Sequence, residues 1–239
     1  TYPWIHIPVG YLKTMHNPKV DWCFKIQSDP GLDGREMNYP RGKTLGGSSS
    51  INGLLYIRGQ SRDYDYWRQM GNIGWGWDDV LPYFKKSENQ ERGESEFHGV
   101  GGPQSVSDQR IKLNLLDIFI DAAEEKGIPR SKDFNTGENE GCGYFQVTEK
   151  NGLRCSTAVG YLNPIKKRSN LRIEVKAHIK KIIFDNLKAV GVEYWQGNEI
   201  KKAKCNNEII LSAGTIGSPH ILQGSGIGSA DLLKSIGID

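Results

Sequence analysis

The stretch Pro40–Gly59, PRGKTLGGSSSINGLLYIRG, concentrates small residues where a backbone must come close to a partner. Three glycines have no Cβ, so their amide N–H groups can face an anion at short range. These glycines are Gly42, Gly46 and Gly47. Hydroxyl groups follow at Ser48–Ser50, while Arg41 and Lys43 add positive charge at the entrance. This composition predicts a loop that binds a phosphorylated cofactor.

Two other interpretations of this loop fit less well. A Gly/Ser-rich linker would be flexible and polar on both sides, whereas this loop lies between Tyr39-Pro40 and the apolar run Leu54–Ile57. A phosphate loop of the Walker type needs Lys and Ser or Thr directly after its last glycine, and a nicotinamide loop needs the spacing G-x-G-x-x-G. Neither pattern occurs here, so we expect another class of nucleotide cofactor.

The run Arg41-Gly42-Lys43-Thr44-Leu45-Gly46-Gly47-Ser48-Ser49, followed by Asn52 and Tyr56, resembles the first signature of the glucose-methanol-choline (GMC) flavoprotein oxidoreductases. Gly214–Gly228, GTIGSPHILQGSGIG, resembles the second signature of this family. The turn at Gly214, at the start of this second segment, either serves the local structure or contacts the cofactor directly. The intervening chain is most similar to the choline dehydrogenase branch, through Asp63–Trp67, His98-Gly99, Gly102-Pro103 and Arg154 with Ser156–Ala158.

The resemblance implies a mixed α/β fold, in which an FAD-binding doubly wound domain is interleaved with a substrate-binding domain. We expect residues 1–95 and 151–228 to belong to the FAD-binding part. Residues 96–150 and 229–239 would then belong to the substrate-binding part. Because members of this family are much longer than 239 residues, we expect the chain to be an internal fragment in which both domains are incomplete.

The cofactor implied by the resemblance is FAD, and the residues expected to bind it follow the family pattern. They are Arg41, Gly42, Leu45, Gly46, Gly47, Ser48, Asn52, Gly53, Leu55 and Ile179. Asn52 and Gly53 would lie beside the isoalloxazine ring, and Ile179 would hold adenine through its main chain. Some choline-oxidising relatives attach the flavin to a histidine just before the Asn. Ile51 stands at that position here, so we expect noncovalent FAD.

The family oxidises primary alcohols by passing hydride to the flavin, and its catalytic base is a histidine near the C-terminus. That histidine is expected beyond Asp239, so no catalytic residue is assigned in this chain, and no metal site. The resemblance favours a choline-like alcohol and a quinone-type electron acceptor. Another alcohol, an oxidase reaction with oxygen, a hydroxynitrile lyase and a fragment that is inactive alone are the alternatives.

Composition restricts the other function classes. The 31 basic and 28 acidic residues give a net charge of +3, too small to indicate nucleic acid as a partner. The four cysteines are widely spaced, which is typical of reduced thiols in an intracellular protein. The histidines form no triad or metal pattern, and His98 is expected to stabilise a turn. We expect a cytoplasmic protein, either free or at the periphery of a membrane, of undetermined oligomeric state.

Local patterns predict the secondary structure. Asp21–Ile26 and Glu36–Tyr39 form a hairpin, and Ser87–Gly102 has the composition of an exposed loop or lid. Helices are expected at 61–70 with Ser61 as the cap, at 78–87, from Leu113 until Gly127, at 157–165 and from Ser218 onward. Strands are expected at 171–175, 179–184, 189–195 and 208–212. Clustered Lys and Arg at 166–168 and 201–204 are expected on solvated faces and turn ends.

Overall fold

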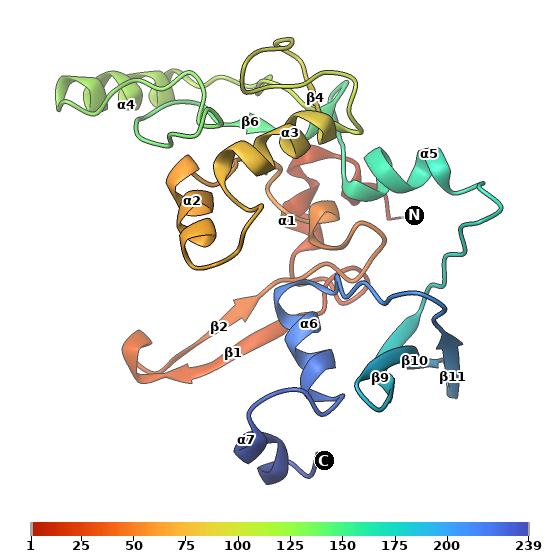
Figure 1. Ribbon diagram of the computed structural model, residues 1–239. Helices are drawn as coiled ribbons and strands as arrows, with labels where there is room; N and C mark the ends of the chain where they lie inside the picture. The colour runs from red at the N-terminus through yellow and green to blue at the C-terminus, as the bar shows by residue number, and fades with distance from the viewer. Residues whose placement is uncertain (1, 239) are drawn as a thin grey trace. The chain divides into compact units, whose positions relative to one another are not determined.

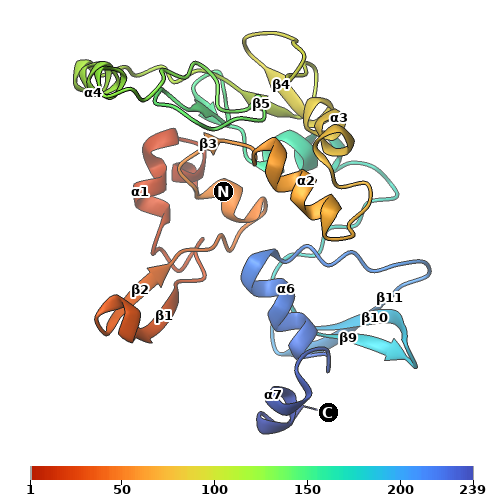
Figure 2. The ribbon, with the colours of Figure 1, turned by 60° about the vertical axis from the view of Figure 1, so that its left-hand side comes forward.

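The computed structural model describes residues 2–238 and divides the chain into two compact units. Unit 1 extends to Arg168 and unit 2 begins at Ser169. Figures 1 and 2 show the mixture of helices and small sheets in both. The mixed α/β character expected from the sequence is confirmed. The interleaved division into FAD-binding and substrate-binding segments stays a prediction.

Unit 1 begins with three short helical turns, and the expected hairpin follows them. The turns are η1 (Pro3–Ile5), η2 (Pro8–Gly10) and α1 (Tyr11–Thr14). Strand β1 (Phe24–Asp29) pairs antiparallel with β2 (Arg35–Tyr39), and η3 (Pro30–Leu32) closes the turn. The two strands form the ribbon labelled β1 and β2 in Figure 1. The hairpin prediction is therefore confirmed, and β2 leads directly into the glycine-rich loop.

Three longer helices of unit 1 also agree with the sequence patterns. They are α2 (Ser61–Gln69), α3 (Trp77–Ser87) and α4 (Asn114–Glu125). Gly127, with φ +84°, ends the last of these. The predicted cap at Ser61 is wrong. Gln60 precedes the helix, and its backbone N–H donates to the Asp63 carboxylate over 2.8 Å, so the acid three residues along closes this end.

Short strands connect distant parts of unit 1. Strand β3 (Leu55–Tyr56) pairs antiparallel with β6 (Gln146–Val147), and β7 (Glu149–Lys150) with β8 (Leu153–Arg154). Strand β4 (Glu88–Gln90) runs parallel to β5 (Gln104–Val106). The predicted short helix at 157–165 consists of a π-helical turn, η5 (Ala158–Leu162), and α5 (Asn163–Ile165). The β3–β6 pair fixes the end of the glycine-rich loop against residues that lie about 90 positions downstream.

The prediction of an exposed loop or lid over Ser87–Gly102 is confirmed as an exposed loop only in its middle, where residues 91–96 are mostly exposed. Its first residues form the buried strand β4, and Glu88 has no exposed surface. His98 is 5% exposed, so it does more than stabilise a turn. The composition misled at Glu88, Gln90 and His98 because these side chains turn inward and bond one another. Buried charges are tolerated only when paired and hydrogen-bonded.

The buried charges form what we call the Glu88 network. Arg58 donates to Glu88 over 2.8 Å. His98 faces Glu88 through Nδ1 at 3.0 Å and Asp133 through Nε2 at 2.7 Å. Burial lowers the pKa of His98, but the hydrogen bonds to Asp133 and Glu88 outweigh it and raise the pKa to about 9. Since both ring nitrogens face carboxylates, the imidazole carries both protons at neutral pH.

Unit 2 is built on a three-stranded antiparallel sheet with the order β11-β10-β9. The strands are β9 (Ala177–Asp185), β10 (Lys188–Gln196) and β11 (Glu199–Lys204). Helix α6 (Gly214–Gln223) packs beside β9, and the Ile182 N–H donates to Ser225 Oγ over 2.8 Å. Helix α7 (Ala230–Ser235) follows. The strands expected at 179–184 and 189–195 are confirmed.

Three sequence predictions in unit 2 are wrong. Residues 171–175 and 208–212 are not strands, since no strand among the described residues pairs with either segment. Apolar β-branched residues favour a strand only when a partner completes the ladder. The lysines at 201, 202 and 204 lie on the exposed strand β11, so the solvated face expected for them is confirmed, although they are not at a turn end. Helix α6 begins at Gly214, and Ser218 accepts from the Ala213 N–H from within the helix.

The Glu88 network predicts a pH-dependent stability. The pKa of His98 in the folded chain lies above the ordinary value near 6.5, so its contribution is fully present below about pH 6.5. It is lost as pH rises toward 9. We expect the thermal midpoint of the full-length protein to exceed that of His98→Gln at pH 6, and this difference to shrink by pH 9. The exposed His220, changed to Gln, is the control, and a pH-independent difference for His98→Gln contradicts the prediction.

Candidate functional site

A buried carboxylate holds the start of the glycine-rich loop. Asp21 is 1% exposed and accepts hydrogen bonds from the backbone N–H groups of His16, Cys23 and Arg41 at 2.7–3.0 Å. Burial raises the pKa of Asp21, but these three hydrogen bonds outweigh it and leave the pKa below its usual value. The Lys43 N–H also donates to the Val20 carbonyl over 2.7 Å. The loop therefore starts from a fixed position.

Hydroxyl groups brace the loop from within. Ser50 donates to the Leu45 carbonyl over 2.8 Å, and Ser49 donates to the Gly46 carbonyl over 2.5 Å. Thr157 joins them, since its N–H donates to Ser49 Oγ over 3.0 Å. Ser48 Oγ accepts from the Gly42 N–H over 3.1 Å, which leaves its own O–H as a donor. Only Ser48 of these three serines keeps its hydroxyl proton for a ligand.

The loop glycines serve two different purposes. A Cβ at Gly42 would lie 2.1 Å from the Gly47 carbonyl oxygen, and one at Gly46 would lie 2.6 Å from Ser50 Oγ. A side chain at either position would collide with atoms of the loop itself. A Cβ at Gly47 or Gly53 would meet nothing within 4 Å. Those two positions border open space, where a ligand can approach the backbone.

The other predicted residues of the loop surround this open backbone. Arg41 is half-buried, lies over the Tyr39 ring at 4.0 Å and donates to the Pro40 carbonyl. Leu45 and Leu55 are about half exposed, at 48% and 52%. The structure thus brings nine of the ten predicted residues, Arg41 to Leu55, into one continuous segment of unit 1.

Ile179 is the tenth, and it lies in unit 2. It is half-buried on the edge strand β9, opposite Tyr194 of β10. Its main-chain role toward adenine stays a prediction.

Asn52 is the exposed polar residue of this segment, and its amide has a fixed orientation. Its Oδ1 accepts from the Leu54 N–H over 3.1 Å and from Arg154 Nη1 over 2.7 Å. Leu54 is buried and has φ +65°, a strained conformation for a bulky residue. Since both contacts engage the oxygen, the Nδ2 group is left as a donor with no hydrogen bond to the described residues.

These residues fit a phosphorylated cofactor with a planar polar ring. The loop offers a hydroxyl donor at Ser48 and the cation Arg41, which are groups suited to an anion. The Gly47 N–H donates to the Thr44 carbonyl over 2.9 Å, so this glycine contributes steric room and not a free donor. Asn52 and Gly53 add an amide donor beside a position without a side chain. In the described part of the chain, no group of three or more His, Cys, Asp or Glu side chains could hold a metal ion.

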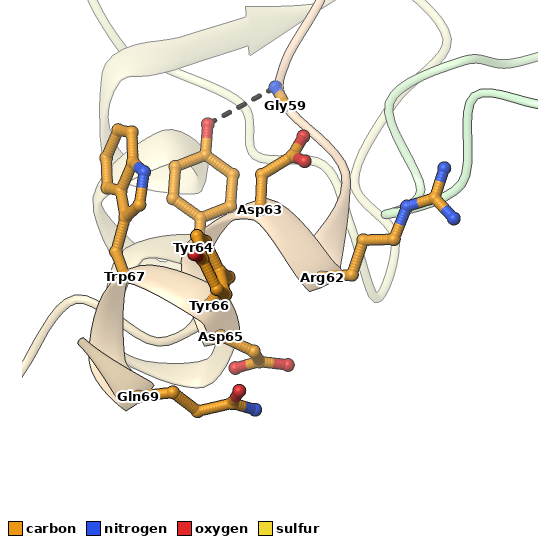
Figure 3. A pocket seen from close by; sticks show the side chains of 8 residues that line it. All are labelled: Gly59, Arg62, Asp63, Tyr64, Asp65, Tyr66, Trp67 and Gln69. Atoms are coloured by element: carbon orange, nitrogen blue, oxygen red, sulfur yellow. Dashed lines mark hydrogen bonds between the residues drawn. The ribbon is translucent and has the colours of Figure 1, made fainter.

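A separate hollow of about 890 Å³ lies over α2 and is lined by Gly59, Arg62 and the residues 63–67 and 69. Figure 3 shows Tyr64 reaching toward Gly59, whose N–H donates to the Tyr64 hydroxyl over 3.2 Å. Asp65 bonds Arg68 and the Trp77 N–H, and Tyr64 packs against Trp67, Trp77 and Phe84. Asp65 holds α2 against α3, and Tyr64 holds it against Gly59 and the aromatic rings. The candidate site is therefore placed at the glycine-rich loop and not at this hollow.

Comparisons with known proteins agree with this geometry. Residues 10–238 match the GMC oxidoreductase family profile. The chain belongs to the GMC oxidoreductase family. It is 42% identical to the oxygen-dependent choline dehydrogenase of Vibrio vulnificus, over 98% of the chain and 42% of that protein. It is also 42% identical to the alcohol dehydrogenase [acceptor] of Pseudomonas putida, over 100% of the chain and 44% of that protein.

Solved structures of this GMC type have the same fold. Pyridoxine 4-oxidase from Mesorbium loti superposes with a TM-score of 0.94 at 29% identity, over 100% of the chain and 47% of that structure. An FAD-dependent oxidoreductase from Chaetomium thermophilum gives 0.90 at 29% identity, over 99% of the chain and 43% of that structure. The chain thus spans less than half the length of these relatives.

Sequence reasoning missed the side chains that support the GMC loop from outside it. Asp21, Thr157 and Arg154 all bond loop atoms, and the last two lie more than a hundred residues downstream. The sequence carries a weak signal for them, because the short run Arg154-Cys155-Ser156-Thr157 follows a turn at Asn151-Gly152. No spacing rule connects that run to Asn52, since the contact depends on the tertiary fold.

The open glycine Gly47 provides a test of the site. Gly47→Ala and the control Gly197→Ala both place a Cβ in open space at a left-handed residue, with φ +53° and +64°. Each change should cost about 1 kcal/mol of stability through backbone strain. Titration with FAD should show roughly tenfold weaker binding or worse for Gly47→Ala alone, because a close contact to the ligand is lost. Equal FAD affinity in the two variants contradicts the assignment.

Proposed function

We propose that the full-length protein containing this chain oxidises a primary alcohol, choline or a close analogue, to the aldehyde with FAD as its cofactor. The observation that carries the proposal is the segment Gly47–Gly53, where open backbone positions and an oriented Asn52 amide lie together on the surface of unit 1. The names of the GMC relatives, a choline dehydrogenase and an alcohol dehydrogenase, support the substrate class.

In this proposal bound FAD would supply the hydride acceptor for the alcohol carbon, and the residues of this chain would bind and orient it. Gly47 lets the cofactor approach the backbone, and Arg41 and Ser48 offer a charge and a donor to its phosphates. Asn52 presents Nδ2–H to the ring system beside Gly53, where no side chain intervenes. None of these groups is a base for the alcohol proton, so we assign that role to a histidine beyond Asp239.

Electron transfer from the reduced enzyme is proposed to use a quinone-type acceptor. The relatives' names differ in this respect, since one is called oxygen-dependent and the other carries the term acceptor. A second candidate is an oxidase acting on a different alcohol, which the likeness to pyridoxine 4-oxidase favours.

We propose a cytoplasmic location, free or at the membrane periphery. No helix among residues 2–238 is long and apolar enough to cross a membrane.

The function is tested with the full-length protein reconstituted with FAD. We expect dye reduction in the absence of oxygen with choline and other primary alcohols, because the dye replaces the quinone. Residues 1–239 alone are the control and should be inactive, since the assigned base lies outside them. Hydrogen peroxide formation at the rate of dye reduction indicates the oxidase instead. An FAD-loaded protein that no alcohol reduces contradicts the proposal.

The flavin is proposed to be noncovalent. Ile51 is 2% exposed and packs in an apolar cluster with Ile5 and Val20, so it offers no nucleophile at the residue before Asn52. Acid precipitation of the full-length protein should therefore release all the flavin into the supernatant, as measured by absorbance. Ile51→His is the matched variant, and yellow colour retained on the denatured wild-type protein contradicts noncovalent binding.

A further inference from the structure

Arg154 is a buried cation without an acidic partner among the described residues. It contacts the segment Gly47–Gly53, which we call the cofactor segment. It is 2% exposed at the end of β8. Its Nε donates to the Ile5 carbonyl over 2.9 Å, and its Nη1 donates to the Ser49 carbonyl over 3.1 Å and to Asn52 Oδ1 over 2.7 Å. Among the described residues, Nη2 is buried and has no hydrogen-bond partner.

This arrangement is unusual, because buried guanidinium groups are normally matched by a carboxylate. Arg58, the other arginine below 6% exposure, has Glu88 at 2.8 Å. Arg154 has only neutral oxygens, and no carboxylate of residues 2–238 forms an ion pair with it. Burial lowers the pKa of Arg154 to about 10, so the group is still charged at neutral pH. Its charge is therefore uncompensated within the chain.

The position of the charge indicates what would compensate it. Arg154 touches Ser49 and Asn52 within the cofactor segment Gly47–Gly53, and Asn52 and Gly53 are exposed. A positive charge in a low-dielectric interior attracts negative charge over several ångströms without direct contact. Hydride transfer from an alcohol to a neutral flavin delivers two electrons and one proton, so the flavin gains one negative charge. The alcohol proton leaves separately to the base.

We propose that Arg154 is a positioning residue of the flavin site, which orients the Asn52 amide and whose unpaired charge favours the flavin once it has become anionic. The inference rests on the proposed FAD cofactor, but it does not depend on which alcohol is oxidised. Arg154 acts through Asn52 and through its field, because its own Nη2 is enclosed by protein. Its two contributions are separable by substitution.

The variants Arg154→Gln, Arg154→Lys and Asn52→Ala separate orientation from charge. The readouts are the FAD dissociation constant and the midpoint potential of the bound flavin, measured by dye equilibration without alcohol. Arg154→Gln should bind FAD roughly tenfold more weakly, as expected for a lost charge-assisted hydrogen bond, and should shift the midpoint potential to more negative values. Arg154→Lys should keep a potential near that of wild type and weaken FAD binding as Asn52→Ala does.

A double variant tests the coupling. If Arg154 acts through Asn52, adding Asn52→Ala to Arg154→Lys should weaken FAD binding little further. Should Arg154→Gln fail to fold, Arg154→Lys and the double variant still decide the orientation role. Wild-type affinity in Arg154→Lys, additive effects in the double variant, or an unchanged potential in folded Arg154→Gln each overturn the proposal. A wild type that binds FAD but oxidises no alcohol contradicts the proposed function alone.

Discussion

Glu88, a carboxylate with no exposed surface, is the constraint around which unit 1 is arranged. A buried charge must be matched by opposite charge and by hydrogen bonds, because the interior cannot solvate it. Arg58, His98 and the Gly99 N–H all converge on this group. Arg58 follows β3, and His98 also binds Asp133, which lies in the connection between α4 and β6. Satisfying one charge therefore fixes the strands beside the glycine-rich loop.

Arg154, in the same unit as Glu88, differs from it in charge balance, and this difference indicates where the functional site lies. Glu88 lies in a network whose charges balance, two cations against two carboxylates, and such a network specifies structure. Arg154 is buried as deeply, yet only neutral oxygens face it. Natural proteins violate polar matching chiefly where a ligand or reaction completes the match. The strained Leu54, two residues from Asn52, is a second local violation beside the same site.

Much of the local structure could be predicted from the sequence, because its causes are local. The turn at Asp29–Gly34 determines the hairpin, and apolar spacing determines α4. The cofactor-binding roles of the loop residues Arg41–Leu55 stay predictions. The failures have tertiary causes. Segment 208–212 lacks a pairing strand among the described residues, and Glu88 and His98 of the expected lid turn inward to Arg58 and Asp133, about 30 residues before and after them.

Exposed apolar side chains limit the stability of this chain when it is alone in water. Large apolar side chains are exposed on α4, with Leu115 at 74% and Phe119 at 65% exposure, and Ile210 is 78% exposed in the segment expected as a strand. Leu55 and Ile57 are half exposed as well, whereas Leu54 is buried.

Exposed apolar faces of this extent destabilise a chain in water and promote association. In the GMC relatives the matched region is under half of the protein. The cofactor segment borders this surface at Leu55, and a flavin seated there would bury apolar area together with its charge. Binding of FAD and burial of the apolar faces should therefore stabilise the fold together, since each favours only the native state.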